Sequence, residues 1–125
     1  KVLLYHGYSF DNHVDAQPDL RKKAYTNPEC AMIDLLKRRH LAPTYTTNLI
    51  SPEERDYLVV EKVPDIFAMG HIHNFTASNY KGVNLICAST FQAQTDFQKR
   101  IGHKPDPGKV AMINLKTRKT LIKIF

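Results

Sequence analysis

Two short apolar runs, each ending where a histidine adjoins a glycine, constrain the fold of this chain more than any other feature. The first is VLLYHG at residues 2–7, and the second is DIFAMGHIH at residues 65–73. Short apolar runs bounded by turn residues are typical of strands buried beneath helices. The two runs therefore predict an α/β chain in which histidines lie at the carboxyl ends of strands, where open sheets bind ligands.

The remaining pattern predicts one main helix and several more strands. Asn27, Pro28 and Glu29 supply a helix start, and apolar residues at helical spacing continue to a stop before Pro43. Strands are expected at three places, the last of them a closing hairpin: residues 57–60, 83–88, and 109–115 with 120–125.

Three other stretches lack a strong pattern. Residues 8–27 are polar and predict an irregular segment, and residues 51–54 are expected to form at most one short helical turn. Residues 89–108 predict a long loop punctuated by proline and glycine, and loops of that length are usually functional or flexible.

Composition narrows the class of protein. The chain has 125 residues, enough for one domain's core, and carries 18 lysines and arginines against 12 acids. This net charge of +6 favours a polyanionic partner such as DNA, although solvated helix and turn faces explain the basic groups equally well. No apolar run approaches the roughly 20 residues that a membrane span needs, and Lys1 rather than methionine suggests part of a longer polypeptide. Cys30 and Cys87 lack a C-x-x-C spacing and are expected to be reduced core thiols of a cytoplasmic protein.

Three histidines are candidate metal ligands: His6, His71 and His73. Neutral imidazole binds zinc, manganese and related ions, and in an extended strand His71 and His73 would point the same way. The alternative is that each is an ordinary hydrogen-bonded histidine at a strand end. His13, His40 and His103 have no such setting and are expected at the surface.

The G-H-x-H pattern after an apolar strand, preceded by a strand ending in H-G, resembles the last two metal motifs of the calcineurin-like metallophosphoesterases. Four longer stretches resemble the C-terminal half of the small subunits of archaeal family-D DNA polymerases. They are YHGYSFDN at 5–12, LLKRRHLAPTY at 35–45, PEERDYLVVEKVPDIFAMGHIHN at 52–74, and STFQAQTDFQKRIGHKPDPGKVAMINLKT at 89–117. The resemblance extends over essentially the whole chain.

That resemblance implies a β-sandwich flanked by helices and a 3′ to 5′ proofreading exonuclease subunit. It implies two divalent metal ions, Mn²⁺ by expectation, with His6 and His71 binding one ion and His73 the other. DNA and the large polymerising subunit are the implied partners. A noncatalytic scaffold subunit and a phosphoesterase acting on a small molecule are the alternatives.

The family's upstream motifs, D-x-H, G-D and G-N-H-D, are missing from this chain. They supply the bridging aspartate, an asparagine ligand and the histidine that contacts the phosphate, and Asp11, Asp15 and Asp19 do not match them. Residues 1–125 are therefore expected to be the C-terminal portion of a metallophosphoesterase domain, inactive alone and prone to self-association through exposed strand edges.

Lys99 and Arg100, in the long predicted loop, are the candidate contacts to DNA phosphates or to the large subunit. Phe91, Phe97 and Tyr80 are candidates for stacking on bases at a frayed primer end, with core or interface packing as the ordinary alternative.

Overall fold

The computed structural model describes residues 1–44, 47–49 and 51–125. Its strands form a four-stranded sheet in the order β1-β2-β4-β3 and a two-stranded hairpin, β5-β6. The strands are β1 (Val2–Tyr5), β2 (Ile66–Met69), β3 (Thr76–Tyr80), β4 (Val83–Cys87), β5 (Lys109–Ile113) and β6 (Thr120–Ile124). The helices are α1 (Phe10–Asp15), α2 (Pro18–Arg21), α3 (Glu29–Arg38) and α4 (Asp96–Arg100).

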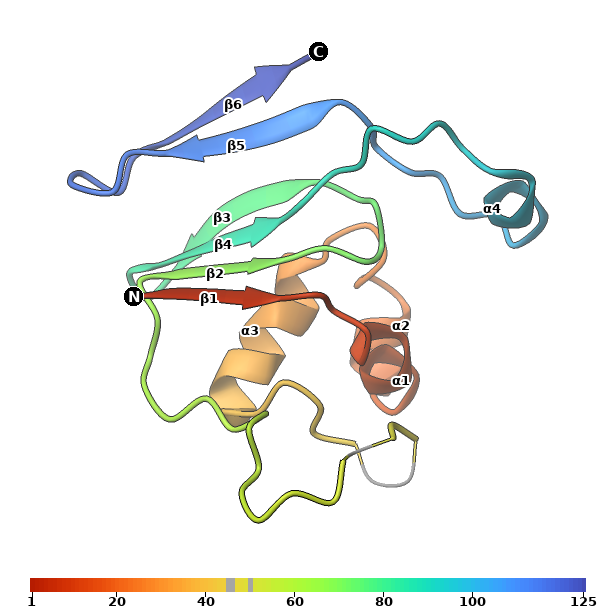
Figure 1. The fold of residues 1–125 in the computed structure, drawn as a ribbon. Coiled ribbons are helices and arrows are strands. Elements are labelled where there is room, and N and C mark those ends of the chain that lie inside the picture. Colours follow the sequence, from red (N-terminus) through yellow and green to blue (C-terminus); the bar gives the residue numbers. More distant parts are fainter. Residues whose placement is uncertain (45–46, 50) are drawn as a thin grey trace.

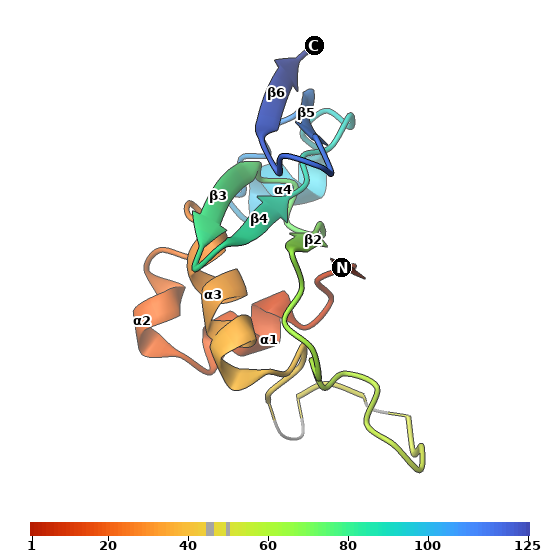
Figure 2. The same cartoon turned by 90° about the vertical axis from the view of Figure 1, so that its left-hand side faces the viewer.

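The four-stranded sheet separates two other layers. Helices α1, α2 and α3 lie on one side of it and the β5-β6 hairpin on the other, as the two perpendicular views show (Figures 1 and 2). Strands β1, β2 and β4 run parallel, whereas β3 is antiparallel to β4. The carboxyl ends of the three parallel strands therefore share one edge, and α4 lies beyond that edge (Figure 1).

The core forms between α3 and the middle of the sheet. Ala31, Met32 and Leu35 lie on one face of α3 and are buried, and they belong to the same apolar cluster as Phe67 of β2 and Leu85 of β4. Burying a side chain of the size of Met32 or Leu35 stabilises the fold by roughly 1.5–3 kcal/mol. This packing fixes the parallel strands and so the residues that follow them.

The mixed α/β class and the main elements are confirmed. Strands β1, β2 and β4, helix α3 and the closing hairpin lie where the sequence predicts them. The predicted strand at 57–60 is wrong: in that stretch only an isolated bridge pairs Val59 with His40. Residues 51–54 form no helical turn. Strand β3 and helix α4 were not predicted.

Residues 8–27 are not irregular as predicted, because they contain α1 and α2. Phe10, His13 and Val14 form the buried face of α1, and Pro18 begins α2. The prediction of His13 as a surface residue is also wrong, since the side chain is fully buried. Two apolar residues four apart, Phe10 and Val14, are too few to stand out as a helical pattern in a polar segment.

Neither cysteine forms a disulfide in the described part of the chain. Cys87 is buried in β4, and burial raises the pKa of its thiol to about 12, so it remains protonated at neutral pH. Across the described residues, every helix is too short or too polar to cross a lipid bilayer.

Candidate metal centre

His6 and His71 are brought together by the register of two strands. Tyr5 at the end of β1 pairs with Met69 at the end of β2, so His6 and the Gly70-His71 pair follow at the same edge of the sheet. The Gly70 amide donates a hydrogen bond to the His6 carbonyl, with an N–O distance of 3.2 Å. The two imidazole rings lie 5.2 Å apart between centroids, so the predicted proximity of the strand ends is observed.

Gly7 makes this close approach sterically feasible. Its φ is +96°, a conformation that favours glycine. A β-carbon built at position 7 would lie 3.1 Å from both the Gly70 carbonyl oxygen and the His71 β-carbon. The glycine therefore permits the chain after β1 to pass directly beside the G-H-x-H turn.

His71 and His73 are not extended, contrary to the sequence expectation. Both have left-handed backbone angles, with φ of 77° for His71 and 55° for His73. Such conformations cost a non-glycine residue roughly 1–2 kcal/mol each and gather at functional sites. Buried Ile72 lies between them and anchors the turn. The two imidazoles consequently make contacts with different parts of the chain.

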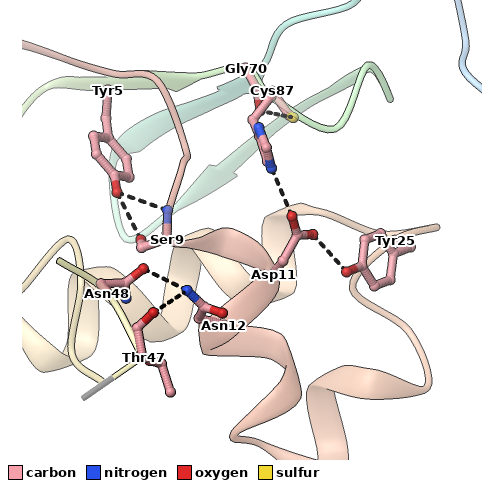
Figure 3. A network of polar contacts seen from close by, with 10 residues as sticks. Tyr5, Ser9, Asp11, Asn12, Tyr25, Thr47, Asn48, Gly70 and Cys87 are labelled. Atoms are coloured by element: carbon pink, nitrogen blue, oxygen red, sulfur yellow. Dashed lines mark hydrogen bonds and ion pairs between the residues drawn. The ribbon is translucent and has the colours of Figure 1, made fainter. Parts of the chain in front are cut away.

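Asp11, in the first turn of α1, is the side chain that holds His71. Its Oδ2 lies 2.8 Å from His71 Nε2, and the Tyr25 hydroxyl donates to its Oδ1 over 2.7 Å (Figure 3). Burial, together with the negative charge of Asp11, raises the pKa of Tyr25, so this hydroxyl keeps its proton. Asp11 was not predicted as a site residue, because it matches no family motif and the sequence of α1 has too few apolar residues to indicate a helix there.

His73 is held by α4 instead. Gln98 Nε2 lies 3.1 Å from His73 Nδ1, while Gln98 Oε1 accepts from the backbone amide of Thr95 at 2.9 Å. This second bond fixes the orientation of the amide, so Nε2 is the donor and His73 Nδ1 the acceptor. In the neutral ring the proton is then on Nε2. His73 Nδ1 accepts the hydrogen bond from Gln98, and His73 Nε2 carries the proton.

These donors fit part of a metal centre and do not complete one. Within residues 1–44, 47–49 and 51–125, no group of three or more His, Cys, Asp or Glu side chains is arranged to hold a metal ion. His6 lies beside His71, and His71 beside Asp11, but the three do not converge. Two divalent ions need more oxygen and nitrogen ligands than the described residues bring together.

A cleft of about 690 Å³ lies against His71 and Asp11. Phe97 of α4 and Ile101, which directly follows α4, contribute to its lining, and so do Gln92 and His103. His103, predicted at the surface, is half-buried at this position.

Lys99 and Arg100 are exposed and do not line the cleft. Lys99 Nζ lies 3.1 Å from Asp96 Oδ1, and both of these side chains are exposed. The structure thus places the two candidate phosphate contacts on the outer side of α4.

No family model matches the chain. Three curated relatives, each named DNA polymerase II small subunit, show the extent of its similarity to known proteins. The Archaeoglobus fulgidus protein is 48% identical over 90% of this chain. The Methanocaldococcus jannaschii protein is 47% identical over 91%, and that of Thermoplasma acidophilum is 40% identical over 99%. The chain spans 22%, 19% and 25% of these relatives, respectively. Over nearly its whole length the chain is similar in sequence to archaeal DNA polymerase II small subunits, and it spans about a fifth to a quarter of their length.

Proposed function

We propose that this chain supplies the histidine-bearing part of a metal-dependent 3′ to 5′ exonuclease centre in a DNA polymerase small subunit. The observation that carries the proposal is the placement of His6 and His71 at the ends of adjacent parallel strands, with ring centroids 5.2 Å apart. The relatives are DNA polymerase II small subunits by name, which supports the polymerase context. DNA and a large polymerase subunit are the proposed partners.

The residues of this chain have distinct roles in the proposed centre. His6 and His71 would be ligands, and Asp11 is a positioning residue. If Asp11 accepts a hydrogen bond from His71 Nε2, the lone pair of His71 is on Nδ1, and the carboxylate fixes the orientation of the ring. A bound divalent ion polarises a phosphodiester and lowers the pKa of water. Binding at His73 Nδ1 would require Gln98 to give up its hydrogen bond.

The incompleteness of the donor set supports a second part of the proposal: the chain is one portion of a larger metallophosphoesterase domain. Val2 and Leu4 of β1 are 56% and 75% exposed at the free edge of the sheet. On β6, Leu121 and Ile124 are 67% and 69% exposed. Apolar strand surfaces of this kind are normally covered. We expect the isolated chain to have no nuclease activity.

The proposal is tested by Mn²⁺-dependent release of nucleotides from the 3′ end of a mismatched primer. The protein is the full-length subunit that carries this chain. His71→Ala should reduce the rate by about 100-fold or more, because a side chain at the metal centre is removed. His40→Ala is the matched control, since His40 pairs with Asp56 at 2.8 Å and belongs to no strand end of the centre. Equal rates in the wild type and His71→Ala would contradict the proposal.

A noncatalytic scaffold subunit is the second candidate. Two observations favour it: the described residues hold no group of three convergent metal donors, and Gln98 occupies His73 Nδ1. Absence of nuclease activity in the wild type, with normal assembly onto the large subunit, would select this candidate.

A further inference from the structure

We propose that the cleft between His71 and α4 binds the unpaired 3′-terminal nucleobase of DNA, with Phe97 as its stacking platform. The inference rests on the proposed function for the presence of DNA. It adds the residue that receives the base and a preference for an unpaired end.

The cleft has the size and lining of a site for one nucleotide. Its volume of about 690 Å³ falls within the range of roughly 300–1,000 Å³ that is usual for small-ligand sites. His71 and Asp11 line it together with Phe97 of α4 and the residue that directly follows the helix end, Ile101. A base held against Phe97 would therefore lie in the same cleft as the proposed metal-binding histidine.

Phe97 is an aromatic residue left open to solvent inside a cleft. It is 62% exposed, and Ile101, the residue that directly follows α4, is 61% exposed. Both side chains line the cleft, so together they present an apolar surface to it. Stacking of a base on an aromatic ring buries such a surface and does not depend on which base is present. A proofreading site needs this tolerance, because any of the four bases can be misincorporated.

The other two aromatic candidates are used differently. Phe91 makes an edge contact with Phe125, with ring centroids 5.7 Å apart, and does not line the cleft. Tyr80 is half-buried and packs against the apolar core. Among the three aromatic residues that the sequence singled out, Phe97 alone faces the cleft.

Helix α4 is fixed in place before any ligand arrives. Thr95 and Gln98 form a reciprocal capping box at its start, and Gln98 also bonds His73. Gln94 Nε2 donates to the His103 carbonyl over 2.7 Å, which joins the segment before α4 to the segment after it. A stacking side chain on a pre-organised element loses little conformational freedom on binding.

Cationic residues lie close to Phe97 in the sequence, although they do not line the cleft. Lys99 and Arg100 on α4 and Lys104 just after it are exposed, and Lys99 Nζ lies 3.1 Å from Asp96 Oδ1. In the proposal they contact phosphates of the strand that leads to the cleft, while Phe97 receives the last base. A base paired in a duplex cannot leave its stack without an energetic cost, so the cleft favours a mismatched or frayed end.

The test uses the full-length subunit in EDTA, so that binding is measured without hydrolysis. The probe is a single-stranded oligodeoxynucleotide with 2-aminopurine at its 3′ end; anisotropy gives the dissociation constant and emission reports stacking of the terminal base. Phe97→Ala should weaken binding by about 5- to 150-fold and abolish the quenching of 2-aminopurine. Phe91→Ala removes a phenylalanine that is 71% exposed and lies outside the cleft, and this variant should match the wild type.

Phe97→Trp guards against a folding artefact, since a wider ring should restore both affinity and quenching. Unchanged binding in Phe97→Ala, an equal loss in Phe91→Ala, or failure of Phe97→Trp to restore quenching would overturn the inference. The two claims are separated by their readouts, because His71→Ala is assayed by 3′ nucleotide release and Phe97→Ala by probe binding in EDTA. If His71→Ala loses 3′ nucleotide release but Phe97→Ala binds the probe normally, the proposed nuclease function stands and the stacking site is refuted. If His71→Ala releases nucleotides normally but Phe97→Ala loses binding, the stacking site stands and the proposed nuclease function is refuted.

Discussion

Asp11 is the single residue that most changes the view of the metal centre obtained from sequence. It contributes a carboxylate 2.8 Å from His71 Nε2, and Tyr25 holds its other oxygen. We expect Asp11→Asn to raise the Mn²⁺ concentration needed for half-maximal nuclease activity by about 10- to 100-fold, because a neutral amide orients and polarises the imidazole less well.

The matched control for this substitution is Asp15→Asn, which removes an exposed carboxylate from the same helix. Its Mn²⁺ dependence should equal that of the wild type. If both variants behave alike, Asp11 acts only through net charge and does not position His71.

His13 predicts a pH dependence of stability. Its ring is fully buried, with Nε2 3.0 Å from Asp34 Oδ2, yet neither ring nitrogen makes an aligned hydrogen bond with a described residue. Burial lowers the pKa of His13 below 6.5; Asp34 opposes this effect and Arg38 adds to it. Below about pH 6.5 the unfolded chain therefore takes up a proton that the folded chain does not, and the free energy of unfolding falls until the lowered pKa is reached.

This prediction is measured by urea unfolding between pH 7.5 and pH 5.5. The wild type should lose stability over that interval, and His13→Gln should lose less of it, whatever its stability at pH 7.5. His103→Gln should keep the wild-type slope, since His103 is only half-buried. Parallel slopes for the wild type and His13→Gln would show that His13 does not cause the effect.

At the scale of elements, the close approach of the segment after β1 to the G-H-x-H turn depends on Gly7. Gly7→Ala should cost roughly 1–2 kcal/mol for the left-handed backbone alone. It should also lower nuclease activity by about 100-fold, because the new β-carbon displaces His71 from His6. Unfolding in urea and the primer assay measure the two effects separately.

Gly82 provides the control for Gly7. Its φ is +83°, close to the +96° of Gly7, but a β-carbon there meets nothing within 4 Å. Gly82→Ala should share the backbone cost and leave nuclease activity unchanged. A comparable loss of activity in both variants would mean that backbone strain, and not displacement of His71, is responsible.

An element can be predicted from sequence when its own residues carry a clear apolar pattern, and cannot when it forms only through contacts with distant residues. Strands β2 and β4 and helix α3 are apolar enough to be recognised, so the proximity of His6 and His71 followed from two strand ends. Strand β3, with the sequence TASNY, has no apolar pattern and exists because β4 pairs with it. The capping box of α4 was present in the sequence as Thr95 and Gln98 and was overlooked in a segment predicted to be a loop.

The contacts of His71 and His73 were not predictable in the same way. Alternating directions along an extended strand would place them on one side, but two left-handed residues around buried Ile72 send them to Asp11 and Gln98. Both partners lie at least 25 residues away in the sequence, and only the packing of α1 and α4 beside the sheet edge brings them there.

At the scale of the whole molecule, His6 and His71 meet at one sheet edge, and the chain spans about a fifth to a quarter of the length of its relatives. Apolar strand surfaces of the chain are exposed. We expect this, together with an incomplete set of candidate ligands, if the remaining ligands of the proposed metal centre come from another part of the domain. The central claim is therefore that His6 and His71 bind a divalent ion in the full-length subunit.

The most direct test is a Mn²⁺ binding titration of the full-length subunit, with free Mn²⁺ followed by its electron paramagnetic resonance signal. The account predicts that His6→Ala and His71→Ala each weaken binding by about 10-fold or more, whereas His40→Ala binds like the wild type. Equal binding in all four proteins would contradict it and leave the two histidines without a role as metal ligands.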